Sequence, residues 1–323
     1  MLKLTPVFRK RNFIDYQMQK TWLLIIVAII CLVLLFVGGP QGYAQRSHEY
    51  VWGLGHILCF GVWTTLLIRW RSGWSFRRQV VAVVTLTLVL GIGIEILQAG
   101  FGRYFDLVDV WNNLIGSLLA LAFSGAARRG LTRLALILLR VVALLFLVAG
   151  LLPLGRVLLD ERLAMKQFPL LSDFETVVEL GRWEGNAHLS ISQDVVSHGA
   201  SSLKMELTSE RYSGLFLKFF PEDWRRFKRL TFDMFNPSDS VLKLTCRVHD
   251  HMHGASGNSY ADRFNRVIAL TPGWTRVDLS LEQITNGPVD RQLDLGRVAG
   301  LGLYATDLAA PETLYLDYVR LSR

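Results

Sequence analysis

The chain has 323 residues, enough for two domains, and 51% of them are hydrophobic. Its mean hydropathy of +0.31 lies above that of ordinary soluble proteins and points to membrane segments. Residues 1–156 hold 16 Lys and Arg against 5 Asp and Glu, whereas residues 157–323 hold 19 against 22, so the positive charge belongs to the hydrophobic half and does not indicate a nucleic-acid partner.

Five apolar runs are each long enough for a helix that crosses a bilayer, which needs about 20 residues. They cover roughly residues 21–39, 50–69, 79–99, 107–125 and 134–154. The first run follows a basic stretch, as in a cleaved signal peptide. Its length, and the lack of a small-residue cleavage site after it, favour a retained span instead.

Lys and Arg residues in the connecting segments predict the orientation of these spans. The N-terminus, the 69–79 loop and the 125–133 loop carry 12 of them, while the alternate loops carry two, Arg46 and Arg103. Positive residues are enriched on the cytoplasmic side. The N-terminus is therefore expected inside, and after five spans the C-terminal half is expected outside. Membrane lipids are the partners that follow from this topology.

Polar residues gather near the expected outer ends of the second, third and fourth runs. Glu95 and Gln98 share a helix face in the third run, and His56 lies early in the second. Ionisable groups in spans usually face a bundle interior or a watery cavity, so one outward-facing pocket is predicted. Its candidate members are His56, Glu95, Gln98, Arg103, Asp106, Asp109 and Asn113; Gly91 and Gly116 lie on the same helix faces, and Asn112 lies in the first turns of the fourth run.

Within such a pocket, His56 and Glu95 could act as an acid–base pair, and Arg103 could hold a phosphate or carboxylate. An opening at the outer leaflet would suit a phospholipid or a lipid-linked substrate. One histidine among scattered carboxylates is a weak case for a metal, and no nucleophile motif is visible. The alternative is structural, with Asp106 or Asp109 as helix caps and amide side chains as hydrogen bonds between helices.

These residues resemble the motifs of the VanZ-like family of small bacterial membrane proteins. The family pattern has a histidine early in one span, then E-x-x-Q, a loop with R-x-x-D-x-x-D, and N-x-x-G entering the next span. Here it reads as His56, "EILQ", "RYFDLVD" and "NLIG" within residues 45–125, with Trp52 and Gly53 where the family usually has an Asp-Lys pair. The resemblance implies a role in the bacterial cell envelope, at the cytoplasmic membrane, without supplying a reaction.

From Leu170 onward, short alternating segments replace the long apolar runs. Nine such segments, including "SLKMELT", "LKLTCRVHD" and "LYLDYVRL", are separated by turn signals such as "SHGASS" and "TNGP". This pattern predicts an antiparallel β-sandwich. Three parts are therefore expected: a helical membrane domain at 1–156, a linker at 157–169 and an extracytoplasmic sandwich at 170–323. Cys246 is the one cysteine after residue 156, which excludes a disulfide framework there.

The second half resembles jelly-roll carbohydrate-binding modules and the related galactose-binding-like folds. The residues that carry the resemblance are "SDFE" at 172–175, Trp183, "TPGWTRVDLSL" and the closing "LYLDYVRL". It implies a glycan ligand and a structural calcium that joins the first and last strands. Asp173, Glu175 and Asp317 would supply the oxygens of that calcium site, or else they are ordinary strand-end carboxylates.

Three closely spaced histidines lie near the middle of this half. His249, His251 and His253 alternate, so on an extended segment they would share one face. Three uses remain open: a transition-metal site, a polar ligand face, or structural pairing. The candidate ligand-binding residues are His249, Asp250, His251, Asp262 and Arg263. Trp224 and Trp274 could stack on sugars, although tryptophan in a sandwich is more often a core residue.

These features predict an envelope protein that binds a glycan or lipid-linked glycan at the outer leaflet, and that could also process it. The alternative is a membrane-anchored scaffold that binds polysaccharide without catalysis. A small-molecule transporter is disfavoured, because the polar residues lie at one face and no repeated broken helices are visible.

Overall fold

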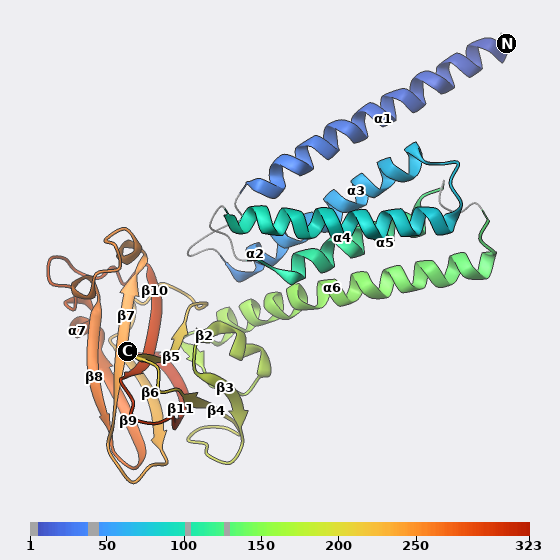
Figure 1. The fold of residues 1–323 in the computed structure, drawn as a ribbon. Helices are drawn as coiled ribbons and strands as arrows, with labels where there is room; N and C mark the ends of the chain where they lie inside the picture. The colour runs from blue at the N-terminus through green and yellow to red at the C-terminus, as the bar shows by residue number, and fades with distance from the viewer. Residues whose placement is uncertain (1–5, 38–44, 101–104, 126–129) are drawn as a thin grey trace. The chain divides into compact units, whose positions relative to one another are not determined.

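The computed structural model describes residues 6–37, 45–100, 105–125 and 130–323. These residues divide into two compact units, Met1–Gly155 and Arg156–Arg323. The first unit is helical, and the second is built from two β-sheets (Figure 1).

Each expected apolar run is helical. The helices are α1 (Pro6–Phe36), α2 (Arg46–Gly53), α3 (Gly55–Trp70), α4 (Phe76–Gly100), α5 (Leu107–Phe123) and α6 (Arg133–Gln167). By length and composition, three stretches of the described chain could cross a membrane: Arg46–Trp70, Phe76–Gly100 and Arg133–Gln167. The other two apolar helices, Thr21–Phe36 and Leu107–Phe123, are shorter. Three stretches of the described residues therefore meet the criterion for a span, where five spans were expected.

Helix α6 extends further than the sequence pattern indicates. Residues 157–167, expected as a linker, continue the helix that begins at Arg133. This segment, "VLLDERLAMKQ", consists mainly of good helix formers, so nothing in it favours an irregular connection. The helix ends just before Phe168, where Pro169 follows and biases the preceding residue away from the helical conformation.

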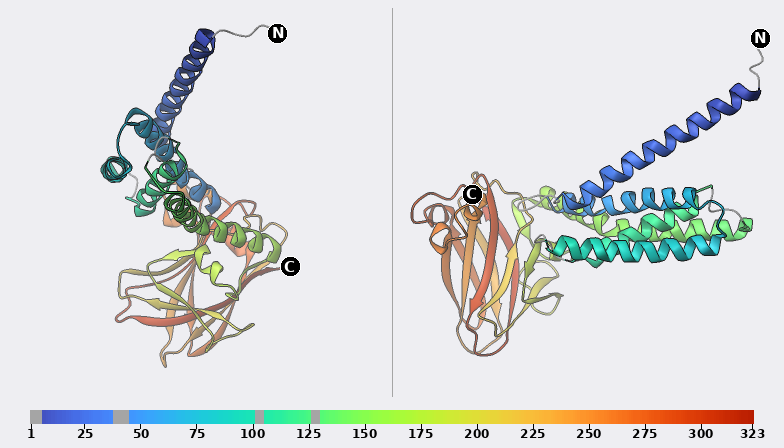
Figure 2. Two further views of the ribbon diagram at one scale, coloured as in Figure 1. Left: turned by 90° about the vertical axis from the view of Figure 1, so that its right-hand side faces the viewer. Right: turned by 45° about the horizontal axis from the view of Figure 1, so that its top comes forward.

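A glycine lets α3 and α5 approach closely. A Cβ on Gly116 of α5 would lie 2.1 Å from the carbonyl oxygen of Ile57 in α3, so the two backbones are in direct contact there. Next to this contact, the Ser117 hydroxyl lies 2.9 Å from that of Thr64 and 2.7 Å from that of Thr87, which links α5 to both α3 and α4. These three helices run alongside one another, with α1 inclined to them (Figure 2).

The second unit is an antiparallel β-sandwich, as predicted. Its strands are β1 (Leu170–Ser172), β2 (Trp183–Gly185), β3 (His188–Ser192), β4 (Ser202–Leu207), β5 (Tyr212–Leu217), β6 (Arg229–Asn236), β7 (Leu242–Asp250), β8 (Phe264–Leu270), β9 (Gly273–Ser280), β10 (Val298–Thr306) and β11 (Glu312–Ser322). One sheet has the order β3-β4-β11-β6-β9 with β1 beside β11, and the other has the order β2-β5-β10-β7-β8. All nine predicted segments are strands. The two additional strands, β1 and β2, have three residues each and are too short to show an alternation.

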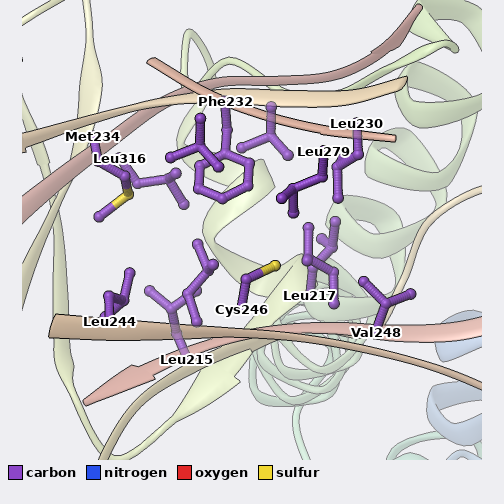
Figure 3. Packing of buried hydrophobic residues seen from close by; sticks show 14 of the residues in the cluster. Leu215, Leu217, Leu230, Phe232, Met234, Leu244, Cys246, Val248, Leu279 and Leu316 are labelled. Atoms are coloured by element: carbon purple, nitrogen blue, oxygen red, sulfur yellow. The ribbon is translucent and has the colours of Figure 1, made fainter. Parts of the chain in front are cut away.

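The core lies between the two sheets. Phe232 and Met234 of β6 and Leu215 and Cys246 of the facing sheet point into the same layer (Figure 3). Burial raises the pKa of the Cys246 thiol to about 12, so this cysteine is an unreactive core residue. Trp224 is fully buried in the same core, and its indole N–H donates to the Pro221 carbonyl oxygen.

A buried arginine joins the C-terminal part of α6 to the sandwich. Arg182 ends the short 3-10 helix η1 (Val177–Arg182), and its side chain is fully buried. Its Nε donates to Asp160 of α6 at 2.8 Å, and Nη1 donates to the Leu171 carbonyl oxygen at 2.7 Å. The Glu179 carboxylate lies 3.9 Å from Nη1. One guanidinium therefore provides the positive charge that pairs with two buried carboxylates.

Replacing this guanidinium should leave both carboxylates without a cation in a buried place. We expect Arg182→Met to lower the free energy of unfolding of the isolated unit Arg156–Arg323 by about 3–5 kcal/mol, measured by urea denaturation. Arg229→Met is the control, because Arg229 pairs with Asp278 at the surface, where ion pairs contribute little. An equal shift in both variants would contradict a special role for Arg182.

Candidate functional site

Three predicted pocket residues from three helices meet in the first unit. His56 of α3, Glu95 of α4 and Asp109 of α5 each offer a ligand-type atom, and these atoms all lie within 4.8 Å of one another. The exposed fractions of the three residues are 3%, 1% and 8%. His56 Nε2 lies 3.3 Å from Asp109 Oδ2. The sequence analysis expected these residues in one pocket, and the structure brings the three of them together.

Asn113 contacts this cluster through His56. Its Oδ1 lies 3.0 Å from His56 Nδ1, and the residue is fully buried. A Cβ at Gly91 of α4 would lie 2.8 Å from Asn113 Nδ2, so the glycine provides the space that Asn113 needs. Gly91 and Asn113, predicted to share the polar faces, are therefore in contact.

The remaining pocket candidates have structural contacts. Asp106 is the N-cap of α5, since its Oδ1 accepts from the Val108 N–H at 2.7 Å, and its own N–H donates to Glu95 Oε2 at 3.0 Å. The amides of Asn112 and Gln98 donate to backbone carbonyl oxygens of Gly53 and Leu35, respectively. Arg103 lies outside the described residues.

The three carboxylates predicted for calcium each accept backbone N–H groups. Asp317 Oδ2 accepts from the N–H groups of Ser197 and His198, each at 2.9 Å. Glu175 Oε1 accepts from the N–H groups at positions 200 and 201, and Asp173 Oδ1 accepts from the N–H of Glu175. These oxygens therefore hold backbone donors. Within the described ranges, the one trio of close ligand atoms is that of the bundle.

The histidine run does not form the predicted extended face. Strand β7 ends at Asp250, and His251–Gly254 is a 3-10 helix, η2. The turn sends His251 toward Glu222, with 3.1 Å between Nε2 and Oε1. His253 turns back, so that its ring centroid is 5.0 Å from that of His249 and its Nδ1 is 3.4 Å from Asp262 Oδ2. The turn follows from Asp250, whose side chain accepts from the Met252 N–H and caps η2.

An arginine that the sequence did not single out pairs with both aspartates of the predicted ligand set. Arg291 donates from Nη1 and Nη2 to the two carboxylate oxygens of Asp250, at 2.6 and 2.8 Å. It also donates to Asp262 at the end of the 3-10 helix η3 (Tyr260–Asp262), at 2.9 Å from Nη2 to Oδ2. These bonds hold the pKa of Asp262 well below its usual range. Asp250 and Asp262 therefore have a structural role.

The outward surface of the five-stranded sheet carries aromatic and basic side chains. Leu215, Leu303 and Cys246 point into the core, so their neighbours in β5, β10 and β7 point outward. We call this surface the aromatic face; its residues are Tyr212, Phe216, Arg247, His249, Arg263 and Tyr304.

Ring contacts hold the aromatic face together. The ring centroid of Tyr304 lies 6.0 Å from that of Tyr212 and 6.3 Å from that of Phe216. The Arg247 guanidinium carbon lies 5.5 Å from the Phe216 centroid, as in a cation–π contact. Tyr212 is 56% exposed, so the face is accessible from solvent.

Two glycines in the central strand make room for these rings. A Cβ at Gly302 would lie 2.4 Å from the Phe216 ring, and one at Gly300 would lie 2.5 Å from the His249 ring. The alternating glycines of "AGLGLYAT" were the sequence signal for this surface, because glycine inside a strand often marks a close approach.

His249 is neutral at physiological pH. Burial, and after it the nearby Arg247 guanidinium, lower the pKa of its imidazole to about 3. Its buried Nδ1 has no hydrogen-bond partner in the described structure. A neutral imidazole nitrogen can donate to or accept from a ligand hydroxyl. Trp274, the other proposed sugar-stacking residue, lies on β9 in the opposite sheet, 40% exposed and 5.2 Å from the Phe235 ring.

The depressed pKa of His249 should make the sandwich less stable in acid. Below about pH 6.5 the unfolded chain binds a proton that the folded His249 does not, so stability falls as the pH drops toward about 3, by up to about 1.4 kcal/mol per pH unit. We expect His249→Asn to flatten this slope in urea denaturation of the isolated unit between pH 6.5 and 4. Thr245→Val, at a neighbouring outward position without a titrating group, should keep the wild-type slope; identical slopes in all three proteins would contradict the expectation.

The chain matches no protein-family model and no curated protein. Among solved structures, it is similar to an exo-β-agarase at a TM-score of 0.38 and 21% identity, over 47% of this chain and 24% of the agarase. It thus spans about a quarter of that enzyme's length. A family 11 carbohydrate-binding module from Clostridium thermocellum, in complex with a β-1,3-1,4-mixed-linked tetrasaccharide, matches at a TM-score of 0.36 and 16% identity, over 47% of this chain and 94% of the module.

Proposed function

We propose that this chain is a multi-pass protein of the bacterial cell envelope that binds a glycan through the aromatic face of its β-sandwich. The observation that carries the proposal is the composition of that face: the Tyr304 ring contacts two further aromatic rings, and two arginines and a neutral histidine lie beside them. A sugar ring has an apolar C–H side that packs on aromatic rings and a rim of hydroxyls that needs polar partners. The aromatic face offers both kinds of contact on one sheet.

Burial and preorganisation support this choice of surface. Tyr304 is 7% exposed and lies between Tyr212 and Phe216, so the centre of the face is held by packing before any ligand arrives. A rigid aromatic surface loses little conformational entropy on binding.

The opposite sheet is the competing surface. It presents Trp274, Phe235 and Tyr315, also in ring contact. We assign the glycan to the aromatic face, where the rings lie beside basic side chains and His249, and use Trp274 as the internal control.

Glycan-array screening of the unit Arg156–Arg323 should identify a ligand, and calorimetry should then separate the two faces. Tyr212→Ala and Arg247→Ala should each weaken binding about tenfold, or about 1.4 kcal/mol, since exposed tyrosine and arginine often dominate recognition. Trp274→Ala should bind as the wild type does. If Trp274→Ala weakens binding and the other two variants do not, the glycan binds to the other sheet. Failure to bind any glycan would refute the proposed function.

The proposal places the helical unit in the cytoplasmic membrane as a VanZ-like bundle of five spans, with the N-terminus inside and the sandwich outside. The distribution of Lys and Arg among the connecting segments supports this orientation. The shorter apolar segments, Thr21–Phe36 within α1 and Leu107–Phe123 (α5), can be accommodated if the bilayer thins locally or flanking residues reach the interface. Clustering of the motif residues His56, Glu95 and Asp109 supports a processing role for the bundle over a simple anchor.

Reporter fusions test this topology directly. A phosphatase that is active only outside the cytoplasm, fused after Leu170, should be active, because an odd number of spans places that residue opposite the N-terminus. A fluorescent reporter that folds only in the cytoplasm should remain dark at the same position. A bright fluorescent fusion together with an inactive phosphatase would overturn the five-span arrangement.

A further inference from the structure

The convergence of an imidazole and two carboxylates inside the bundle has the composition of a metal site. His56, Glu95 and Asp109 come from three different helices and are more than nine-tenths buried. Two carboxylates are costly in an apolar bundle unless positive charge lies close to them. A divalent cation would offset both negative charges at once, with the imidazole remaining neutral.

Glu95 gives an independent indication of a ligand. Its Oε2 accepts the N–H of Asp106, which fixes the carboxylate at the start of α5. The other oxygen, Oε1, is buried and has no hydrogen-bond partner in the described part of the chain. A buried carboxylate oxygen without a donor loses its hydration and gains nothing in return. A cation at the cluster would satisfy this oxygen.

The contacts of His56 favour metal coordination through Nε2. Its Nδ1 faces the Asn113 side-chain oxygen at 3.0 Å, and that amide is packed against Gly91. If Nδ1–H donates there, the Nε2 lone pair points toward Asp109. Histidine ligands of metals are commonly held in this way by an outer hydrogen bond on the second nitrogen.

One edge of the cluster has the length expected for a small cation, and the third ligand atom lies within 4.8 Å of the other two. Two ligands bound at roughly 2.0–2.1 Å to a tetrahedral ion lie roughly 3.3–3.4 Å apart. The 3.3 Å between His56 Nε2 and Asp109 Oδ2 agrees with that edge. Calcium prefers six to eight oxygens at longer distances, whereas imidazole with carboxylates suits zinc and related first-row divalent ions.

We propose that His56, Glu95 and Asp109 bind one divalent transition-metal ion of the zinc class. Three protein ligands leave a fourth position for water or for an oxygen of a substrate, as in catalytic rather than structural zinc sites. Asn113 and Asp106 are positioning residues, because they orient the histidine and the glutamate without providing ligand atoms. This site is independent of glycan binding by the sandwich.

The test is metal binding by the full-length protein purified in detergent, stripped with a chelator and titrated with Co²⁺ alone. One equivalent of Co²⁺ should bind, with visible absorption of the intensity expected for a four-coordinate ion, and Zn²⁺ should displace it. Glu95→Gln and Asp109→Asn keep the side-chain shape but remove a charged ligand, so each should weaken binding at least tenfold. His56→Gln should also change the absorption spectrum of any Co²⁺ that still binds.

Ser117→Ala is the matched control, since Ser117 is a buried polar residue of α5, the helix that carries Asp109, and it has no role in the cluster. It should bind Co²⁺ as the wild type does. Circular dichroism and gel filtration will show that each variant keeps its helices and remains monodisperse. Absence of Co²⁺ binding by the wild type, or equal binding by the folded Glu95→Gln variant, would overturn the metal site. Neither result would affect glycan binding by Arg156–Arg323, so the two proposals fail separately.

Discussion

A charged or polar side chain that leaves water must find a partner inside the protein, and this requirement organises both units. In the sandwich, Arg182 serves Asp160 and Glu179, while Arg291 holds Asp250 by two hydrogen bonds. Removing one partner of such a group costs much more than an exposed ion pair contributes. In the bundle, Glu95 Oε1 has no such partner in the described residues, so the same requirement points there to a bound ligand.

The sequence predicted architecture better than it predicted side-chain partners. Long apolar runs and period-two alternation arise within single elements, so they indicated the helices and nine of the strands. The proximity of the bundle cluster could also be predicted, because helix spacing and the expected orientation placed His56, Glu95 and Asp109 at one depth. The role of Arg291 could not be predicted, because it lies 41 residues from Asp250 and 29 from Asp262 in the sequence, and no local pattern links them. The shared extended face considered for the histidine run does not form, since the cap formed by Asp250 turns the chain before His251, and the contacts of His251 and His253 agree with the alternative of structural pairing.

The aromatic face shows why a surface assembled across strands is hard to read from a sequence. Tyr212 and Phe216 lie in β5, Tyr304 in β10 and Arg247 in β7, and their contacts depend on strand order. Sequence-adjacent strands do not make this surface, because β10 is inserted between β5 and β7. Only the alternating glycines of β10 carry a local signal, and they indicate a crowded surface without naming the side chains that cover it.

The backbone contact at Gly116 has a mechanical consequence for the bundle. Since the Ile57 carbonyl would be 2.1 Å from a Cβ there, the distance between α3 and α5 is set by main chain and not by adjustable side chains. When a bilayer thickens or thins, helices respond by tilting. Two helices in such contact should tilt together as one rigid body. With the bundle in a membrane, as proposed, the separation of His56 from Asp109 and Asn113 would then be preserved in bilayers of different thickness.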